Sequence, residues 1–315
     1  MSELNNITLS AVIACYKDGE AIPVMHKRLT NVFQKIGCNY EIIFVNDGSP
    51  DDSEIILENI CQKDEKTTAI FHSRNFNSQN AFTSGMIHSK GDAVILLDGD
   101  LQDPPEIIED FVKKWLEGYD VVYGTRINRD TSKMMNYAYK KFYRIFNKLS
   151  YLDIPLDAGD FSLMDRKVVN EINNTKERDR FIRGLRAWVG FKQIGVPYYR
   201  PERLFGKSTN NFLKNIKWAK KGIFSFSYLP LELMSFFSYI IVLISAIALL
   251  FYIILHFVNQ DAPKGITTLI VLVLFLGGIQ LLSISVLSEY IGKILEETKK
   301  RPNFIVKKIL NNKKK

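Results

Sequence analysis

Two carboxylates one residue apart follow directly on an apolar run near the end of the first third of the chain. Residues 93–97 read Ala-Val-Ile-Leu-Leu, the pattern of a buried strand, and Asp98, Gly99 and Asp100 come next. Ligands of open α/β sheets bind outside the carboxyl ends of the strands, so both acids are expected at a binding site. Two oxygen ligands there suit Mg²⁺ or Mn²⁺ bound together with the phosphates of a substrate. A polar turn that merely ends a core strand is the alternative.

Other polar groups follow strand-like runs in the same way. Apolar runs at 7–16, 40–45, 68–71 and 119–123 alternate with helical patterns, including those from about 79 to 89 and after Pro104 and Pro105. This alternation predicts a mostly parallel sheet with right-handed crossovers. Because the carboxyl ends of parallel strands share one edge, polar residues from these ends are expected to converge: Tyr16, Asp18, Asp47, Asp98, Asp100 and Arg126.

Motifs that are missing from the sequence narrow the chemistry. No G-x-G-x-x-G follows the first strand, and no G-x-x-x-x-G-K-[ST] loop occurs, so a dehydrogenase or P-loop site is excluded. The net charge is +8, but no zinc-finger or RNA-binding signature is present, and the basic residues gather near C-terminal apolar segments. We therefore expect a membrane rather than nucleic acid as partner. The three scattered cysteines fit buried thiols in a reducing cytoplasm.

The last third of the chain is very apolar. Segments 231–258 and 266–287 are each long enough to cross a hydrocarbon core of roughly 30 Å, and a buried hairpin of a soluble protein is the alternative. Lysines flank both outer ends, which predicts that these ends are cytoplasmic and that connector 259–265 lies outside. Residues 212–230 read as an amphipathic helix in the membrane interface. Residues 131–149 form a basic, aromatic helical stretch that either packs on the sheet or touches lipid or an anionic acceptor.

Longer motifs then give a resemblance to a known family. They comprise Val45–Ser49, Ser73–Phe76, Asp98–Glu106, Gly159–Met164, Phe181–Gly184, Trp188–Gly190, Leu276–Gln280, Glu289–Gly292 and Glu297–Pro302. On these the chain resembles the polyisoprenyl-phosphate glycosyltransferases of glycosyltransferase family 2, bactoprenol glucosyltransferases in particular. The resemblance implies a GT-A fold, with a glycosyltransferase domain at 1–211, a juxtamembrane amphipathic helix at 212–230, a transmembrane hairpin at 231–290 and a basic cytoplasmic tail at 291–315.

The resemblance also implies roles for individual residues. Tyr16, Asp18 and Asp47 would bind the nucleotide, with Asp98 and Arg126 also at the nucleotide-sugar, and Asp100 with Gln102 would ligate the metal that bridges the diphosphate. Phosphate of the acceptor would be bound by Arg126, Arg203 and Lys207. Asp160 resembles an active-site acid of open role, which we place with Asp100 as catalytic.

Two departures from the family pattern stand close to these residues. Asn77-Ser78-Gln79 replaces the usual Gly-Lys-Glu, and Thr209 ends the usual Arg-x-x-Gly-x-Ser-Lys motif, in which Lys207 could substitute for the missing lysine. Neither departure affects the expected metal ligands.

The expected activity is inverting transfer of a hexose, glucose or N-acetylglucosamine, from a UDP-sugar to undecaprenyl phosphate for O-antigen or cell-wall modification. The expected protein is a multi-pass protein of the bacterial inner membrane and a homo-oligomer, with a flippase and a second glycosyltransferase acting downstream. The alternatives are a processive polysaccharide synthase, which usually carries Gln-x-x-Arg-Trp where this chain has Arg183-Gly184-Leu185-Arg186-Ala187-Trp188, and a non-catalytic membrane scaffold.

Overall fold

The computed structural model describes residues 6–127, 158–205, 227–258 and 265–311. It divides into two compact units: the first comprises residues 1–144, 152–212 and 301–315, and the second comprises residues 145–151 and 213–300. The helix expected at 131–149 and most of the one expected at 212–230 lie outside the described residues.

An eight-stranded sheet forms the centre of the first unit, in the order β7-β5-β6-β4-β1-β2-β3-β8. The pairs β1–β2, β1–β4, β2–β3 and β5–β7 are parallel, whereas β6 runs antiparallel to both β4 and β5, and β8 runs antiparallel to β3. The predicted mostly parallel sheet is therefore confirmed. Its strands are β1 Thr8–Cys15, β2 Asn39–Asn46, β3 Thr67–His72, β4 Ala93–Asp98, β5 Val121–Arg126, β6 Ala158–Asp165, β7 Gln193–Tyr198 and β8 Val306–Leu310.

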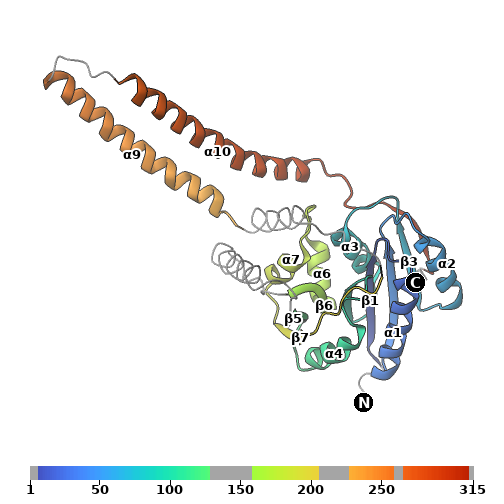
Figure 1. Ribbon diagram of the computed structural model, residues 1–315. Helices are drawn as coiled ribbons and strands as arrows, with labels where there is room; N and C mark the ends of the chain where they lie inside the picture. Colours follow the sequence, from blue (N-terminus) through green and yellow to red (C-terminus); the bar gives the residue numbers. More distant parts are fainter. Residues whose placement is uncertain (1–5, 128–157, 206–226, 259–264, 312–315) are drawn as a thin grey trace. The chain divides into compact units, whose positions relative to one another are not determined.

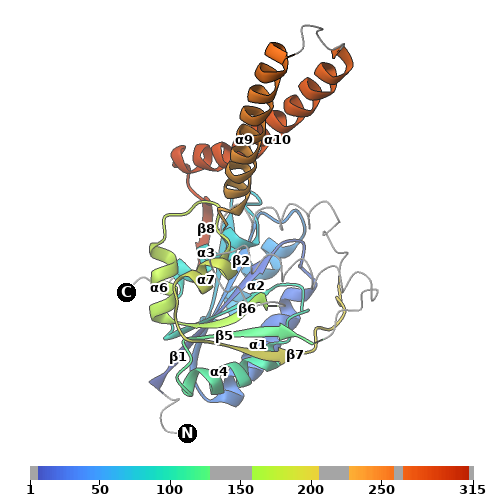
Figure 2. The ribbon, with the colours of Figure 1, turned by 90° about the vertical axis from the view of Figure 1, so that its left-hand side faces the viewer.

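Helices cover both faces of this sheet, as Figures 1 and 2 show. Along β1, Leu9, Ala11 and Ile13 join one buried cluster, and Val12 and Ala14 join the other. This period of two, with both faces apolar, is why the strands read as continuous hydrophobic runs. Helices α1 Ala21–Ile36, α2 Ser53–Lys63 and α4 Ile108–Leu116 contribute to the first cluster, and α3 Ser78–His88, α6 Arg166–Asn174 and α7 Ile182–Trp188 to the second.

The direction of β6 decides which of its ends lies at the predicted site. Because β6 is antiparallel to β4 and β5, its first residues lie beside the carboxyl ends of those strands, with Ala158 opposite Thr125. From the sequence, Gly159 allows a tight turn that presents Asp160, and no strand is predicted there. In the structure Asp160 lies within the strand and at the same edge of the sheet as Arg126.

Strand β8 is a feature that the sequence did not reveal within the basic tail expected at 291–315. It pairs with β3, Ile309 lying opposite Ile70, and so covers that edge of the sheet. Lys308 forms ion pairs with Glu54 and Glu58 of α2. Five residues with two adjacent lysines give too short an apolar alternation for a strand to be recognised from sequence.

The second unit contains the two predicted apolar helices. They are α9, Leu229–Val258, and α10, Ile266–Thr298, which run alongside each other in Figures 1 and 2 and touch where Ser283 Oγ donates to Met234 Sδ at 3.3 Å. Leu229–Ala248 and Val271–Thr298 are long and apolar enough to cross a membrane. Large side chains on them are exposed, Leu243 by 62% and Phe275 by 63%, as lipid-facing positions require.

The residue that precedes α3 has a strained backbone. Asn77 has φ 76° and ψ 155°, a conformation that costs a non-glycine residue about 1–3 kcal/mol. Glycine relieves this strain, but it also raises the conformational entropy of the unfolded chain, which lowers the stability by about 0.4–1 kcal/mol. We expect Asn77→Gly to raise the free energy of unfolding by about 1 kcal/mol, measured by denaturation of the purified protein.

A matched control for this prediction lies in α1, where Asn31 is exposed on a right-handed helix. Asn31→Gly is expected to lower stability by about 0.3 kcal/mol. An equal loss of stability in both variants would contradict the assignment of strain to Asn77.

Candidate active site

The carboxyl ends of three neighbouring strands bring the predicted acids together. Asp98 ends β4, Asp18 follows β1 and Asp47 follows β2, and these strands are adjacent in the order β4-β1-β2. Asp18 and Asp47 are buried, with 8% and 2% of their surface exposed, and so is Asp100 with 8%. Tyr16 donates its backbone N–H to Asp18 Oδ2 at 2.9 Å. The predicted convergence at one edge is what the strand order produces.

The loop after β4 holds its two predicted metal ligands close together. Asp100 Oδ1 accepts the backbone N–H of Gln102 at 3.1 Å. Leu101 between them is fully buried and left-handed, with φ 61°, a conformation that tight functional turns impose on non-glycine residues. Gly99 lets this loop approach β1, since a Cβ there would lie 2.9 Å from Cys15 Sγ and 3.1 Å from Asp18 Oδ2.

Two arginines of the segment after β7 reach this loop. Arg203 Nη2 donates to Asp100 Oδ2 at 3.1 Å and lies 3.9 Å from Asp18 Oδ1. Arg200 Nη2 donates to Gln102 Oε1 at 2.9 Å. Arg203, which the resemblance gives as a phosphate-binding residue, lies at Asp100 in the loop after β4, whereas Arg200 was not singled out from the sequence. The one feature of the sequence that could have pointed to Arg200 is its position three residues before Arg203.

Burial first, and then like charge, raises the pKa values of two acids in this cluster. Burial, followed among the raising effects by the charge of Asp100, raises the pKa of Asp18 to about 6 against the opposing effects of the Tyr16 amide and Arg203. Burial and the charges of Asp103, Asp100 and Asp160 likewise hold the pKa of Asp98 well above its usual value. Added positive charge would stabilise these carboxylates in their ionised form.

The oxygens of Asp100 and Gln102 fit a hard divalent cation. Each already accepts a hydrogen bond from a cationic guanidinium, so both face a position where positive charge is favourable. Within the described ranges no three His, Cys, Asp or Glu side chains form a complete metal-binding set. Mg²⁺ is commonly bound by one or two carboxylates together with substrate phosphates, so two protein ligands suffice.

Asp160 is buried and held by two side chains from different elements. Gln79 Nε2 donates to its Oδ2 at 3.0 Å, and Arg183 Nε donates to its Oδ1 at 3.1 Å. Burial acts to raise the pKa of Asp160, but the charge and hydrogen bond of Arg183, with Arg186 and Gln79, lower it below the usual value. Asp160 is therefore a fixed carboxylate. Gln79, Arg183 and Arg186 adjoin Asp160 but were not among the site residues expected from the sequence.

Arg126, at the end of β5, belongs to the same neighbourhood. Its Nε donates to the Tyr198 hydroxyl at 3.4 Å, and that hydroxyl donates to Asp103 Oδ1 at 2.6 Å. A Cβ on Gly159 would lie 3.1 Å from Arg126 Nη2, so this glycine admits the guanidinium beside Asp160. Lys207 lies outside the described residues.

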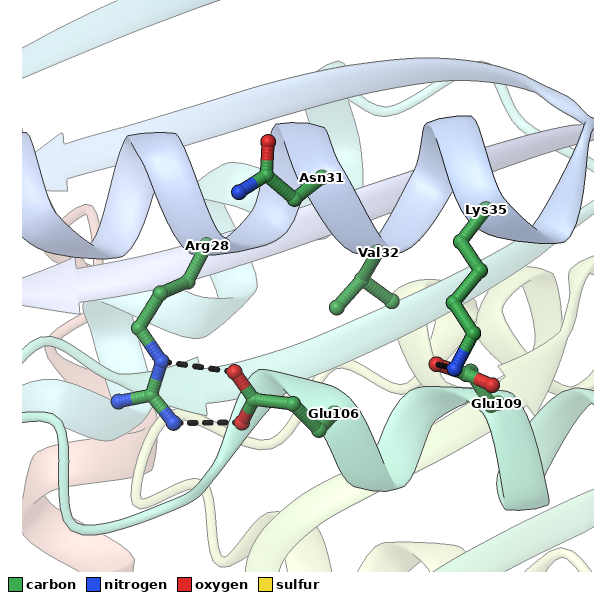
Figure 3. A pocket seen from close by; sticks show the side chains of 6 residues that line it. All are labelled: Arg28, Asn31, Val32, Lys35, Glu106 and Glu109. Atoms are coloured by element: carbon green, nitrogen blue, oxygen red, sulfur yellow. Dashed lines mark hydrogen bonds and ion pairs between the residues drawn. The ribbon is translucent and has the colours of Figure 1, made fainter.

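Figure 3 shows a surface hollow between α1 and the 3₁₀ turn η2, Pro105–Ile107, with the start of α4. Its charged side chains are paired with one another: Arg28 Nε donates to Glu106 Oε1 at 2.8 Å, and Lys35 Nζ donates to Glu109 Oε1 at 2.7 Å. We assign the hollow a structural role. The Arg28–Glu106 ion pair holds η2, which follows the loop after β4, against α1.

Comparison with known proteins identifies the family of this chain. Residues 10–172 match glycosyl transferase family 2. The chain belongs to this family. An uncharacterised glycosyltransferase of Synechocystis is 42% identical over 95% of each chain. The bactoprenol glucosyl transferase of Shigella phage SfII is 38% identical over 95% of this chain and 97% of its own. The prophage bactoprenol glucosyl transferase homolog of Escherichia coli K12 is 37% identical over 96% and 99%.

Among solved structures, glucosyl-3-phosphoglycerate synthase of Mycobacterium tuberculosis in complex with Mn²⁺, UDP-glucose and phosphoglyceric acid matches 69% of this chain and 78% of its own. The identity is 15% and the TM-score 0.47. Family membership therefore stands on the sequence relatives.

The contact between Gln79 and Asp160 gives a prediction about charge. In Gln79→Glu one oxygen can still accept the backbone N–H of Ile182, as Gln79 Oε1 does at 2.8 Å, but the other meets Asp160, and one of the two acids must be protonated. The folded pKa of the new glutamate is then raised above its unfolded value of about 4.3. Its stabilisation is present below that value and is lost as the pH rises through the folded pKa.

We therefore expect the stability of Gln79→Glu, relative to wild type, to fall between about pH 5 and pH 8 in thermal unfolding. Gln62→Glu, on the exposed face of α2, is the control and should differ from wild type by a constant amount. A pH-independent difference for Gln79→Glu would show that Gln79 and Asp160 are not in contact.

Proposed function

We propose that this protein transfers glucose, with inversion, from UDP-glucose to a polyprenyl phosphate, undecaprenyl phosphate in bacteria. The observation that carries the proposal is the acidic edge formed by the buried Asp18 and Asp100 and the half-buried Asp98, joined by Arg200 and Arg203. The carboxylates can bind a metal cation and the arginines can bind an anion. Such a site suits a diphosphate with its metal ion. Support for glucose and for a bactoprenol acceptor comes from the relatives, which are named as bactoprenol glucosyl transferases.

The donor would lie along the ends of β1, β2 and β4. Tyr16, Asp18 and Asp47 would bind the nucleotide, and Asp98 and Arg126 would contact the nucleotide-sugar. Asp100 and Gln102 would hold Mg²⁺ or Mn²⁺, which when bound neutralises the charge of the departing diphosphate. Arg203 lies beside Asp100 and would donate hydrogen bonds to the diphosphate oxygens, where the negative charge gathers.

The acceptor phosphate would be bound by Arg126, Arg203 and Lys207. A phosphate monoester has a second pKa of about 6 and is largely a dianion at neutral pH, so it needs positioning rather than deprotonation. Asp160 would then orient the donor or stabilise positive charge at the anomeric carbon. An acidic limb in the pH–rate profile that disappears in Asp160→Asn would instead make Asp160 a titrating base.

Transfer assays test the reaction itself. Purified protein in membranes containing undecaprenyl phosphate is supplied with a panel of UDP-sugars, and the lipid product is identified by mass spectrometry. We expect a hexosyl lipid from UDP-glucose in preference to UDP-N-acetylglucosamine. A polymer would favour a processive synthase, and the absence of any product would favour a scaffold.

Metal dependence is tested with a matched pair of variants. EDTA is expected to abolish transfer, and Mg²⁺ or Mn²⁺ to restore it. Asp100→Asn should lower kcat by at least about 100-fold because a metal ligand is lost. Asp110→Asn, an exposed position on α4 that pairs with Lys113, should not affect transfer. Full activity of Asp100→Asn in excess EDTA would refute the metal assignment.

The membrane arrangement is part of the proposal. We infer a multi-pass protein of the bacterial inner membrane whose glycosyltransferase domain and C-terminal end are cytoplasmic, which matches the cytoplasmic pool of UDP-sugars. A homo-oligomer, a flippase for the product and a second glycosyltransferase complete the proposed system.

Cysteine labelling tests this arrangement in a variant in which Cys15, Cys38 and Cys61 are replaced. A new cysteine at Asn259 should react with an impermeant reagent on intact cells, and one at Lys313 should react only after lysis. The reverse pattern would contradict the orientation.

A further inference from the structure

The segment that follows the second membrane-candidate helix is built into the glycosyltransferase domain. Helix α10 ends at Thr298, and the carbonyl of Arg301 already accepts hydrogen bonds from the guanidinium of Arg178. The carbonyl of Ile305 accepts the backbone N–H of Ser73 at 2.9 Å. Strand β8 then continues along β3. These backbone bonds fix where the side chains between Arg301 and β8 are placed.

One of those side chains, Phe304, stacks on His72, the last residue of β3. The ring centroids are 5.2 Å apart and the planes differ by 12°. Phe76 packs against the same imidazole edge-on, with centroids 5.8 Å apart and planes at 84°. The side chain of His72 has no exposed surface. Two aromatic rings from different parts of the chain thus enclose the imidazole.

His72 in turn holds Asp47, the acid after β2. Its Nδ1 lies 2.8 Å from Asp47 Oδ1, and since a carboxylate only accepts hydrogen bonds, Nδ1 carries the proton. The same oxygen accepts the backbone N–H of Phe76 at 2.8 Å. Among the hydrogen bonds of the described residues none uses Oδ2 of Asp47, which leaves this oxygen for a ligand.

The orientation of the imidazole depends on packing. Histidines that position a carboxylate or a metal are usually held by a hydrogen bond on each ring nitrogen. In the described part of the chain, Nε2 of His72 is buried and has no hydrogen-bond partner. Apart from the hydrogen bond between Nδ1 and Asp47, the ring is held by the packing of Phe304 and Phe76, and loss of the Phe304 ring would free one face of it.

We propose that His72 and Phe304 are positioning residues for the donor nucleotide: Phe304 holds the imidazole, and the imidazole holds Asp47 with one oxygen turned toward the nucleotide. The inference rests on the role of Asp47 in the proposed function. It means that sequence beyond the membrane hairpin completes the donor site, although it lies more than 200 residues from β3 in the chain.

The test measures UDP binding by calorimetry with Mn²⁺, and steady-state transfer, on the full chain. His72→Leu and Phe304→Leu keep apolar volume but remove the donor or the ring. Both are expected to raise the Kd for UDP and the KM for UDP-glucose about tenfold, with kcat at saturating donor within about twofold of wild type. His72→Asn, whose amide nitrogen replaces Nδ1, and Phe304→Tyr should restore near-normal values.

Ile305→Ala is the control on the same segment, because its side chain is 53% exposed and its carbonyl bond to Ser73 is retained. It should bind UDP as wild type does. A Phe304→Leu protein with unchanged Kd and KM overturns the proposal, and so does one in which only kcat falls, since that reports a smaller folded fraction.

Asp47→Asn separates failure of this inference from failure of the proposed donor site. If Asp47→Asn weakens UDP binding while the His72 and Phe304 variants bind normally, the positioning role is wrong and the donor site stands. If Asp47→Asn binds UDP as wild type does, the nucleotide role of Asp47 is wrong and the inference fails with it.

Discussion

Repulsion between buried carboxylates is the constraint on which the rest of this structure depends. Asp98 and Asp100 follow β4 and Asp18 follows the adjacent β1, and the charge of Asp100 raises the pKa values of both Asp18 and Asp98 on top of the effect of burial. Such a cluster is stable only with compensating positive charge, which Arg200 and Arg203 supply from the segment after β7. The parallel order β4-β1-β2 aligns the acids, and β7, at the far end of the same sheet, leads to the arginines.

Backbone strain accompanies this arrangement. Lys17, Asn77 and Leu101 have φ values of 61°, 76° and 61°, and they follow β1, β3 and β4 respectively. Residues held in such conformations persist only where surrounding contacts over-determine them, and they concentrate at binding sites. Lys17 and Leu101 lie at the strand ends that carry Asp18, Asp98 and Asp100, and Asn77 lies two residues before Gln79, which contacts Asp160. The tightly packed sheet below them supplies the rigidity that keeps the loops in place.

The strands of the sheet and the acids at their ends could be predicted from short stretches of the sequence. Each strand before an acid is a continuous apolar run, and the rule that ligands bind at carboxyl strand ends placed Asp18, Asp47 and Asp98 together. Contacts made across the chain could not be predicted. Asp160 meets Gln79 at a sequence separation of 81 because β6 enters the sheet antiparallel, and nothing in residues 158–165 encodes that direction.

Reciprocal calorimetry tests whether the acidic edge binds the diphosphate of the donor through a divalent cation. UDP is titrated into the full chain with Mn²⁺ or with EDTA, and Mn²⁺ is titrated with and without UDP. Each ligand is expected to tighten the binding of the other by the same factor, about tenfold or more, and Asp100→Asn is expected to remove this coupling. Equal UDP affinity in Mn²⁺ and in EDTA would contradict it.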